Sequence, residues 1–328
     1  MKAVRIHQHG GPEVLRLEEV ADPEPGRGEI RVRVAAAGVN FIDVYRRTGY
    51  YPVGDLPAIL GGEGAGVVDR VGPAVAGVAE GDRVCFWDAS GAYAQRVVLP
   101  AARAIPLGRS GPDERPMELH VAAALPLQGM TAHYLTRGIR PLASGDTVLI
   151  HAAAGGVGLL AVQMAKIAGA TVFGTCSTEE KAERARAAGC DHVILYTRED
   201  FVAAVHRETG GVGVDLALDG VGRATFEDSV RATRVRGHVV LYGQASGEPE
   251  PVRPRKLLGS RTLTSASLAD YAGDRDEMLA RAEDVFRWFR ERRLEVRVDR
   301  VLPLARAEEA HRALEGRETS GKVLLTPP

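Results

Sequence analysis

A strand, a glycine-rich turn and a helix are encoded in succession by TVLIHAAAGGVGLL at residues 147–160. Thr147–His151 has the apolar character of a short buried strand, and an apolar helix follows the turn. Glycines between a strand and a helix let the backbone approach a pyrophosphate, which the amides at the helix N-terminus then bind. Alanine stands where a strict GxGxxG motif has its first glycine, giving Ala153-x-Gly155-x-x-Gly158. A tight turn that binds nothing is the alternative.

Strands and helices alternate after this turn. A capping box at residues 177–180 marks the start of one of the helices. Alternation of this kind predicts a doubly wound parallel sheet built from right-handed crossovers. The pattern predicts strands at 171–174, 192–195, 214–218 and 238–242, and helices at 177–189, 199–208 and 224–233.

The first hundred residues have a different pattern, with short valine-rich segments separated by Gly, Pro and Asp turns. They predict an antiparallel, barrel-like unit that is interrupted by one helix at Phe41–Arg47. The chain becomes helical from Pro116 to Gly138 with a break at Pro126. After about Ser260 the pattern is mixed and predicts a strand, a long helix at Arg275–Arg293, a strand, a helix and a final strand at Lys322–Thr326. A length of 328 residues fits two domains.

Composition excludes several classes of protein. A formal charge of −1 argues against a protein that wraps nucleic acid. Three cysteines without a C-x-x-C pair argue against a disulfide framework and a structural zinc site. We expect a cytoplasmic protein. Arginine outnumbers lysine 37 to 5, and Asn40 is the only asparagine, which suits either heat adaptation or a genome rich in G and C.

The residues after the second predicted strand bear on the choice of dinucleotide. NAD enzymes place an acid there to bind the ribose hydroxyls, but residues 174–177 read GTCS. Ser177 and Lys181 offer a hydroxyl and an ammonium group, which suit a 2′-phosphate. Glu179 and Glu180 are evidence against that site, and the alternative is a helix cap at Ser177 with a solvated lysine.

Motifs along the whole chain resemble one family. They are GD at 145–146, AAGGVG at 153–158, GVNFIDVYRRTGYYP at 38–52, GGEGAG at 61–66 and SGKV at 320–323. Together they resemble the zeta-crystallin and quinone oxidoreductase group of the medium-chain dehydrogenase/reductase superfamily. The resemblance implies a GroES-like catalytic domain at 1–122 and 261–328, with a Rossmann dinucleotide-binding domain at 123–260 inserted in it.

The same resemblance implies that no metal acts in catalysis. Zinc enzymes of the superfamily carry a cysteine ligand within the segment that is Gly38–Asp43 here, and Gly-His-Glu where this chain has Gly61-Gly62-Glu63. The group that stabilises charge on the substrate oxygen must then be a hydrogen-bond donor. We expect Asn40, Tyr45 and Tyr51 to be catalytic. The alternatives are a helix cap for Asn40 and a packing role for Tyr45.

Further positions are matched to cofactor contacts of the family, and for each the alternative is a turn or edge residue. The predicted cofactor-binding residues are Asn40, Thr131, Ala154, Gly155, Gly156, Val157, Gly174, Ser177, Lys181, Tyr196, Gly220, Tyr242, Gly243, Gln244 and Lys322.

The expected activity is NADPH-dependent, zinc-independent reduction of a quinone or a conjugated carbonyl. Three alternatives stay open: an enone or enoyl-thioester (2-alkenal) reductase of the same fold, a non-catalytic NADPH sensor, and an RNA binder. We expect a small-molecule substrate, a homodimer, and neither a nucleic acid nor a membrane as partner.

Overall fold

The computed structural model describes residues 1–108 and 115–328. Two compact units divide the chain. Unit 1 comprises Met1–Gly129, Asp274–Arg292 and Val296–Pro328, and unit 2 comprises Met130–Gly273 and Arg293–Glu295. Unit 2 begins seven residues after the predicted start of the dinucleotide-binding segment, and its main part ends thirteen residues after the predicted end at 260.

Unit 2 is built on a six-stranded parallel sheet in the order β11-β10-β9-β12-β13-β14. The order reverses at β9, so the sheet is doubly wound, as the alternation of strands and helices predicts. Its strands are β9 (Thr147–Ile150), β10 (Thr171–Cys176), β11 (His192–Leu195), β12 (Val214–Asp219), β13 (Thr233–Leu241) and β14 (Thr262–Ser265). The sheet extends past the predicted domain boundary at residue 260, because β14 pairs in parallel with β13.

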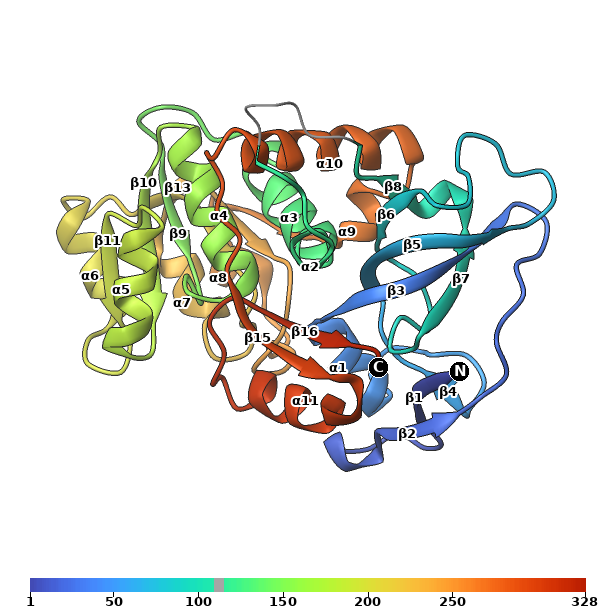
Figure 1. Ribbon diagram of the computed structural model, residues 1–328. Helices are drawn as coiled ribbons and strands as arrows, with labels where there is room; N and C mark the ends of the chain where they lie inside the picture. Colours follow the sequence, from blue (N-terminus) through green and yellow to red (C-terminus); the bar gives the residue numbers. More distant parts are fainter. Residues whose placement is uncertain (109–114) are drawn as a thin grey trace. The chain divides into compact units, whose positions relative to one another are not determined.

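Helices cover both faces of this sheet. The chain passes through α4 (Gly156–Ile167) and α5 (Glu179–Ala187) in one direction, and through α6 (Phe201–Glu208) and α7 (Phe226–Ala232) in the other. Right-handed crossovers therefore place the two pairs on opposite faces, and α4 and α5 lie on the near side of the strands in Figure 1. Unit 2 also contains η3 (Tyr134–Gly138), α8 (Pro254–Leu258) and α9 (Leu268–Tyr271).

Unit 1 contains two sheets. The smaller has the order β2-β1-β4, and the larger has the order β15-β16-β3-β5-β6-β8, with β7 also paired to β3. The pairs within the first hundred or so residues are antiparallel, as predicted for that segment, and β15 pairs in parallel with β16 near the end of the chain. The strands are β1 (Lys2–Ile6), β2 (Arg16–Glu19), β3 (Glu29–Val39), β4 (Ala58–Ile59), β5 (Glu63–Val71), β6 (Arg83–Phe86), β7 (Arg96–Pro100), β8 (Ala104–Pro106), β15 (Val298–Pro303) and β16 (Lys322–Thr326).

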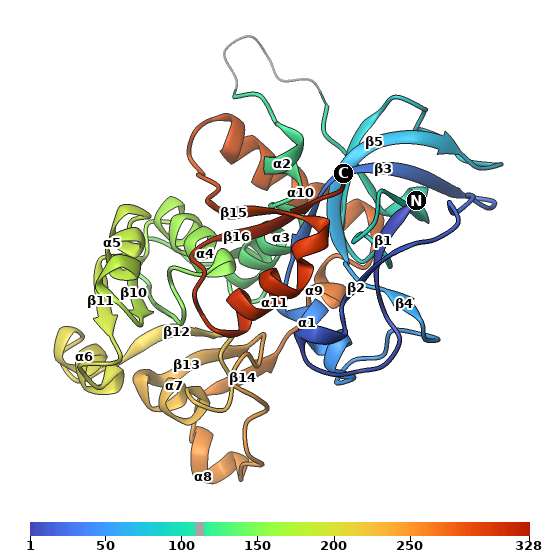
Figure 2. The same cartoon turned by 60° about the horizontal axis from the view of Figure 1, so that its bottom comes forward.

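Short helices connect these strands. Figure 2 shows α11 (Ala307–Glu315) beside β15 and β16, and contacts between these elements agree. The helix α3 (Pro126–His133) begins in unit 1, at the proline where a helix break is predicted, and ends in unit 2. The other helical segments of unit 1 are α1 (Phe41–Thr48), α2 (Leu119–Ala122), α10 (Arg275–Arg290), η1 (Pro12–Val14), η2 (Ala101–Arg103) and η4 (Leu304–Arg306).

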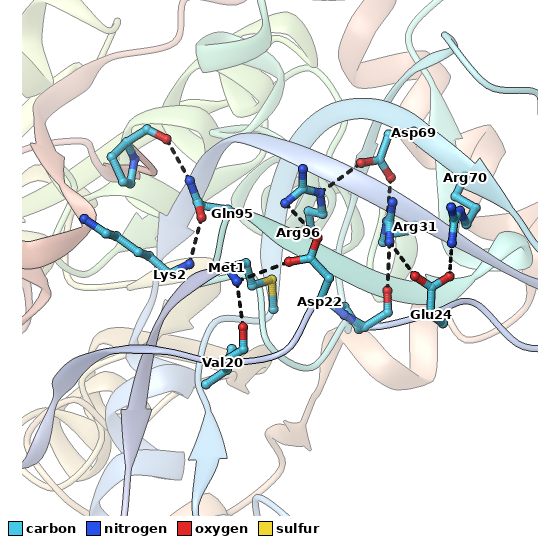
Figure 3. A network of polar contacts seen from close by, with 12 residues as sticks. Met1, Lys2, Val20, Asp22, Glu24, Arg31, Asp69, Arg70, Gln95 and Arg96 are labelled. Atoms are coloured by element: carbon cyan, nitrogen blue, oxygen red, sulfur yellow. Dashed lines mark hydrogen bonds and ion pairs between the residues drawn. The ribbon is translucent and has the colours of Figure 1, made fainter.

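An ion-pair network lies on the β-rich unit (Figure 3). Arg31 donates to Asp69 at 2.8 Å and to Glu24 at 3.1 Å, and Arg96 bonds Asp69 at 3.1 Å and Asp22 at 3.1 Å. These contacts hold the pKa of Arg31 above its usual value, chiefly through the hydrogen bond to Asp69. A network of this kind stabilises more than isolated surface pairs do, particularly at high temperature.

Candidate active site

Three polar side chains meet in unit 1 at one end of neighbouring strands. Lys322 begins β16, Glu63 begins β5, and Asn40 follows directly after β3, which lies between those two strands. The register places Gly38 opposite both Glu63 and Leu324. Asn40, Glu63 and Lys322 are 4%, 0% and 1% exposed, so the cluster is screened from water.

The amide of Asn40 bonds to both charged partners. Its Nδ2 donates to Glu63 Oε2 at 2.8 Å and, over 3.4 Å, to the Gly38 carbonyl. Its Oδ1 accepts from Lys322 Nζ at 2.7 Å and from Gln128 Nε2 at 3.4 Å. Asn40 is also the N-cap of α1 and forms a capping box with Asp43, so the cap is present and the contacts with Glu63 and Lys322 come in addition to it.

Glu63 joins the cluster to α3. Its Oε2 also accepts from Lys322 Nζ, and its Oε1 accepts from the Leu127 amide at 2.7 Å. A buried ion pair survives only when further hydrogen bonds satisfy both charges, and these contacts supply them. A Cβ on Gly38 would lie 2.3 Å from Glu63 Oε2 and 2.8 Å from Lys322 Nζ, so only glycine leaves room for the pair.

The predicted tyrosines form an aromatic cluster on α1 and the loop after it. The ring of Tyr45 lies 5.4 Å from that of Tyr51 and 5.8 Å from that of Tyr50, both edge to face. Phe41, one turn earlier on α1, lies 6.2 Å from Tyr45. Tyr50 and Tyr51 remain 49% and 39% exposed, so an aromatic surface is open to a ligand.

Gly62 stands at the position where zinc enzymes of the superfamily carry a histidine. A Cβ on Gly62 would lie 3.1 Å from the Arg46 guanidinium, so a cation lies beside this position. In residues 1–108 and 115–328, no three His, Cys, Asp or Glu side chains are grouped so that they could hold a metal ion. The absence of a catalytic metal stays a prediction for metal analysis.

The glycine-rich turn lies in unit 2 at the carboxyl end of β9, where ligands bind in open α/β sheets. Gly155 caps α4, and Gly155, Gly156 and Val157 are partly exposed. A Cβ on Gly158 would lie 2.2 Å from the Ala152 carbonyl, which explains the last glycine by close packing of the turn on the helix. The Gly155 amide donates to the Ala152 carbonyl at 2.8 Å, and the amides that follow it, at the start of a twelve-residue helix, fit a pyrophosphate.

A buried polar network that the sequence does not predict holds this turn. Asp219, at the end of β12, accepts from Ser229 Oγ at 2.7 Å, and Ser229 lies 2.9 Å from His151 Nε2. His151 Nδ1 lies 3.1 Å from Thr175 Oγ1, which accepts from the Ala152 amide at 3.3 Å. Burial lowers the pKa of His151, so the ring is neutral. Ala152 has a φ of +50°, and this network stabilises that uncommon backbone.

The end of β10 differs from the prediction in two respects. The strand continues to Cys176 rather than ending at Gly174, and Thr178 rather than Ser177 caps α5, accepting from the Lys181 amide at 3.3 Å. Of two adjacent hydroxyl residues, the second has the extended backbone of a cap, with a φ of −135°. Ser177 is therefore not needed as a cap, and Lys181 lies in the first turn of α5.

The two acids near this position are both paired with arginines. Glu179 bonds Arg186 at 2.9 Å and Arg198 at 3.5 Å. Glu180 pairs with Arg184 one turn later on the helix. The evidence that these carboxylates give against a phosphate site is therefore weakened, because their charge is locally neutralised.

The remaining predicted cofactor residues lie in unit 2. Gly174 is inside β10, where a Cβ would lie 2.7 Å from both Ala153 and Cys190, so packing accounts for this glycine. Tyr196 follows β11 and is 42% exposed. The others are buried or partly exposed: Ala154 in the turn, Thr131 in α3, Gly220 after β12, and Tyr242, Gly243 and Gln244 after β13.

Comparison with known proteins places the chain in a family. Residues 26–109 match the alcohol dehydrogenase GroES-like domain, and residues 156–284 match the zinc-binding dehydrogenase family. Quinone oxidoreductase 1 of Escherichia coli is 39% identical over 99% of both chains. The chain belongs to the quinone oxidoreductase group of the medium-chain dehydrogenase/reductase superfamily.

Two further relatives show how far the similarity to the quinone oxidoreductase group extends. The crystal structure of Escherichia coli quinone oxidoreductase complexed with NADPH superposes with a TM-score of 0.95, at 38% identity and over 100% of both chains. A 2-haloacrylate reductase of a Burkholderia species is 41% identical over 99% of this chain and 98% of its own. The two printed activities differ, so membership of the group does not identify the substrate.

Proposed function

We propose that this protein is an NADPH-dependent reductase that transfers hydride to a quinone without the help of a metal ion. The observation that carries the choice of quinone is the open cluster of Tyr45, Tyr50 and Tyr51. A flat, electron-poor ring stacks well on such a surface, whereas a short unsaturated acid gains little from it.

NADPH is favoured over NADH by the end of β10. The strand ends in Cys176 and is followed by Ser177 and Lys181, which carry the hydroxyl and ammonium groups that suit a 2′-phosphate. The structure of a relative complexed with NADPH supports this choice. We assign the pyrophosphate to the turn at Gly155 and to the amides of Gly156 and Val157 at the start of α4. When bound, NADPH supplies the hydride.

The side chains of unit 1 supply hydrogen-bond donors for the reduction. A quinone takes up a hydride and one proton to become a hydroquinone, and negative charge develops on its oxygen before the proton arrives. We assign the donors to the Tyr45 hydroxyl and to the Asn40 Nδ2 hydrogen whose contact with Gly38 is the long one, 3.4 Å. Lys322 and Glu63 orient the Asn40 amide.

A second candidate is the reduction of a conjugated carbonyl or a 2-haloacrylate, which the 41% identical Burkholderia enzyme favours. Hydride would then go to the β-carbon, and the same donors would stabilise an enolate. This candidate does not explain the aromatic cluster.

A panel of acceptors tests the two proposals. Purified protein is assayed by NADPH absorbance loss with benzoquinones, naphthoquinones, an enone, an enoyl thioester and 2-chloroacrylate. We expect kcat/KM to be highest for quinones, and Tyr51→Ala to lower it about 2- to 13-fold for quinones only, because stacking on an aromatic ring contributes about 0.5–1.5 kcal/mol. Leu17→Ala, an equally exposed apolar residue of unit 1, is the control. A preference for 2-chloroacrylate that Tyr51→Ala leaves unchanged would favour the second candidate.

The partners and the cellular location follow the same proposal. The substrate is a small molecule, and we propose a homodimer in the cytoplasm that binds no nucleic acid. In the part of the chain that the structure describes, no helix is both long enough and apolar enough to span a membrane.

A further inference from the structure

Unit 1 contains a second buried network of hydrogen bonds, which also includes Asn40. The side chain of Asn40 bonds Glu63 and Lys322, whereas its backbone amide bonds the second network. Asp43, in the first turn of α1, accepts from the Asn40 backbone amide at 2.9 Å through Oδ2. The same oxygen accepts from the Tyr93 hydroxyl at 3.1 Å. Tyr93 also lies 3.1 Å from Nε2 of His311, which comes from α11 near the end of the chain. All three side chains are fully buried.

The direction of every hydrogen bond in this network is fixed by Arg47. Its Nη1 lies 3.2 Å from His311 Nδ1, and both terminal nitrogens bind Glu315 at 2.8 Å. A guanidinium can only donate, so Nδ1 of His311 must accept and Nε2 must carry the ring hydrogen. His311 therefore donates to Tyr93, and Tyr93 donates to the Asp43 carboxylate. Burial and the charge of Arg47 lower the pKa of His311 to about 3, so the ring stays neutral.

We propose that Tyr93 and His311 are positioning residues for the reaction, which act on Asn40 through Asp43. The inference rests on the proposed role of Asn40 in orienting the substrate oxygen. An amide displaced by a fraction of an ångström loses its alignment with that oxygen, and a misplacement of about 1 Å can cost about a hundredfold in rate. The network thus links His311 of α11 to Asp43 in the first turn of α1, over a separation of 268 residues in the chain.

The network is strongest while Asp43 is ionised, because protonation of the carboxyl removes the negative charge that strengthens both hydrogen bonds to Oδ2. Burial raises the pKa of Asp43 to about 6, and the Asn40 amide, Arg46, Lys322 and Tyr93 oppose that rise. Its other oxygen, Oδ1, receives no hydrogen bond from the described residues. The charged and titratable groups that face Asp43 and Tyr93 are Arg46 and Arg47 of α1, Glu63 of β5, His311 of α11 and Lys322 of β16.

Tyr93→Phe tests the proposal, because it removes one hydroxyl from the centre of the network. Without that donor the pKa of Asp43 rises further, so the acid limb of kcat moves from near pH 6 to a higher pH by about one unit. A shift of this size should lower kcat about twofold at pH 7 and about fivefold at pH 6 relative to the wild type, while KM for NADPH changes less than twofold. Thr136→Val, which removes a buried hydroxyl from a helix of unit 2, is the control and should keep the wild-type pH profile.

Thermal unfolding separates this proposal from the proposed function. The folded carboxyl of Asp43 has a pKa above that of the unfolded chain, so it destabilises the fold as pH rises through 4 to 6. Tyr93→Phe extends this window upward, and its loss in Tm must therefore be larger at pH 8 than at pH 5. The same loss at both pH values would show that the hydroxyl is only a packing group and would overturn the proposal, whatever the enzyme reduces.

A second pair of variants covers the case in which Tyr93→Phe folds poorly. His311→Gln places an amide donor near the position of Nε2 and should restore most of the activity, whereas His311→Leu should behave as Tyr93→Phe does. Equal activity and equal pH profiles for both His311 variants would contradict the proposal.

Discussion

Removing one charge from the Glu63–Lys322 pair should lower the free energy of unfolding, because it leaves the other charge buried without its partner. Lys322→Met leaves a carboxylate that is 0% exposed and retains donors only from Asn40 and Leu127. Glu63→Gln leaves a Lys322 ammonium group that is 1% exposed and has no carboxylate partner. It still donates to Asn40 Oδ1 at 2.7 Å. Breaking one side of a buried pair costs about 3–5 kcal/mol.

The two changes are not expected to have equal effects. Lys322→Met should lie near 3 kcal/mol, because two hydrogen bonds still satisfy Glu63, and Glu63→Gln should lie nearer 5 kcal/mol. The double variant buries no charge, so its loss should be smaller than the sum of the two single losses by about 2 kcal/mol or more. A loss of 3 kcal/mol corresponds to a fall in Tm of about 6–12 °C in a domain of this size.

Thermal and guanidinium chloride unfolding, followed by near-UV circular dichroism, measure this cycle. NADPH binding, followed by fluorescence, reports whether unit 2 keeps its function in each variant. Single losses below 1 kcal/mol, or strictly additive losses, would show that the two charges do not depend on one another, and the explanation of Gly38 by close approach would then also be wrong.

Three further outcomes are expected. Asn40→Ala should lower turnover about 100- to 1000-fold while Tm changes by only a few degrees; preserved turnover with a lowered Tm would make Asn40 only a structural residue. The purified protein should contain less than 0.1 zinc per chain (a limit of about one site in ten) and keep full activity in EDTA, and one tightly bound zinc would refute this. Arg31→Met should lower the free energy of unfolding by about 1–3 kcal/mol, with a smaller loss in 1 M salt. Arg70→Met, at a guanidinium that is 51% exposed in the same network, is the control and should cost less than about 1 kcal/mol.

The parallel sheet was predictable from the sequence because local signals agree with one another. An apolar strand, a glycine turn and a capped helix recur with a spacing that only right-handed crossovers satisfy. Errors occur where two neighbouring residues could serve equally well. Ser177 and Thr178 both carry a hydroxyl group, and the backbone geometry alone selects Thr178 as the cap. The strand after Ser260 is predicted, but it is assigned to the catalytic domain, since nothing in the four residues of β14 indicates their pairing with β13.

Of the buried cluster, the sequence singles out Asn40 and Lys322 but not Glu63, and it predicts none of the contacts among them. Asn40 and Lys322 stand out by rarity and by resemblance, but 282 residues separate them, and no local pattern predicts that Lys322 Nζ bonds Asn40 Oδ1. Glu63 as the shared partner and Gly38 as the space beneath it depend on the register of three strands. A lysine and a glutamate that each begin an apolar strand are the signal that sequence analysis could have used, because such charges must find partners.

The relative efficiency of NADPH and NADH tests the central claim most directly. With a benzoquinone held constant, kcat/KM for each cofactor is measured in the wild type and in Lys181→Ala at one ionic strength. A charge-assisted contact to the 2′-phosphate contributes about 1.5–3 kcal/mol, or roughly 10- to 150-fold in affinity. We predict that the wild type prefers NADPH by at least tenfold and that Lys181→Ala removes most of this preference without changing kcat/KM for NADH. Equal efficiency with both cofactors in the wild type, or an equal loss for both in the variant, would contradict the account.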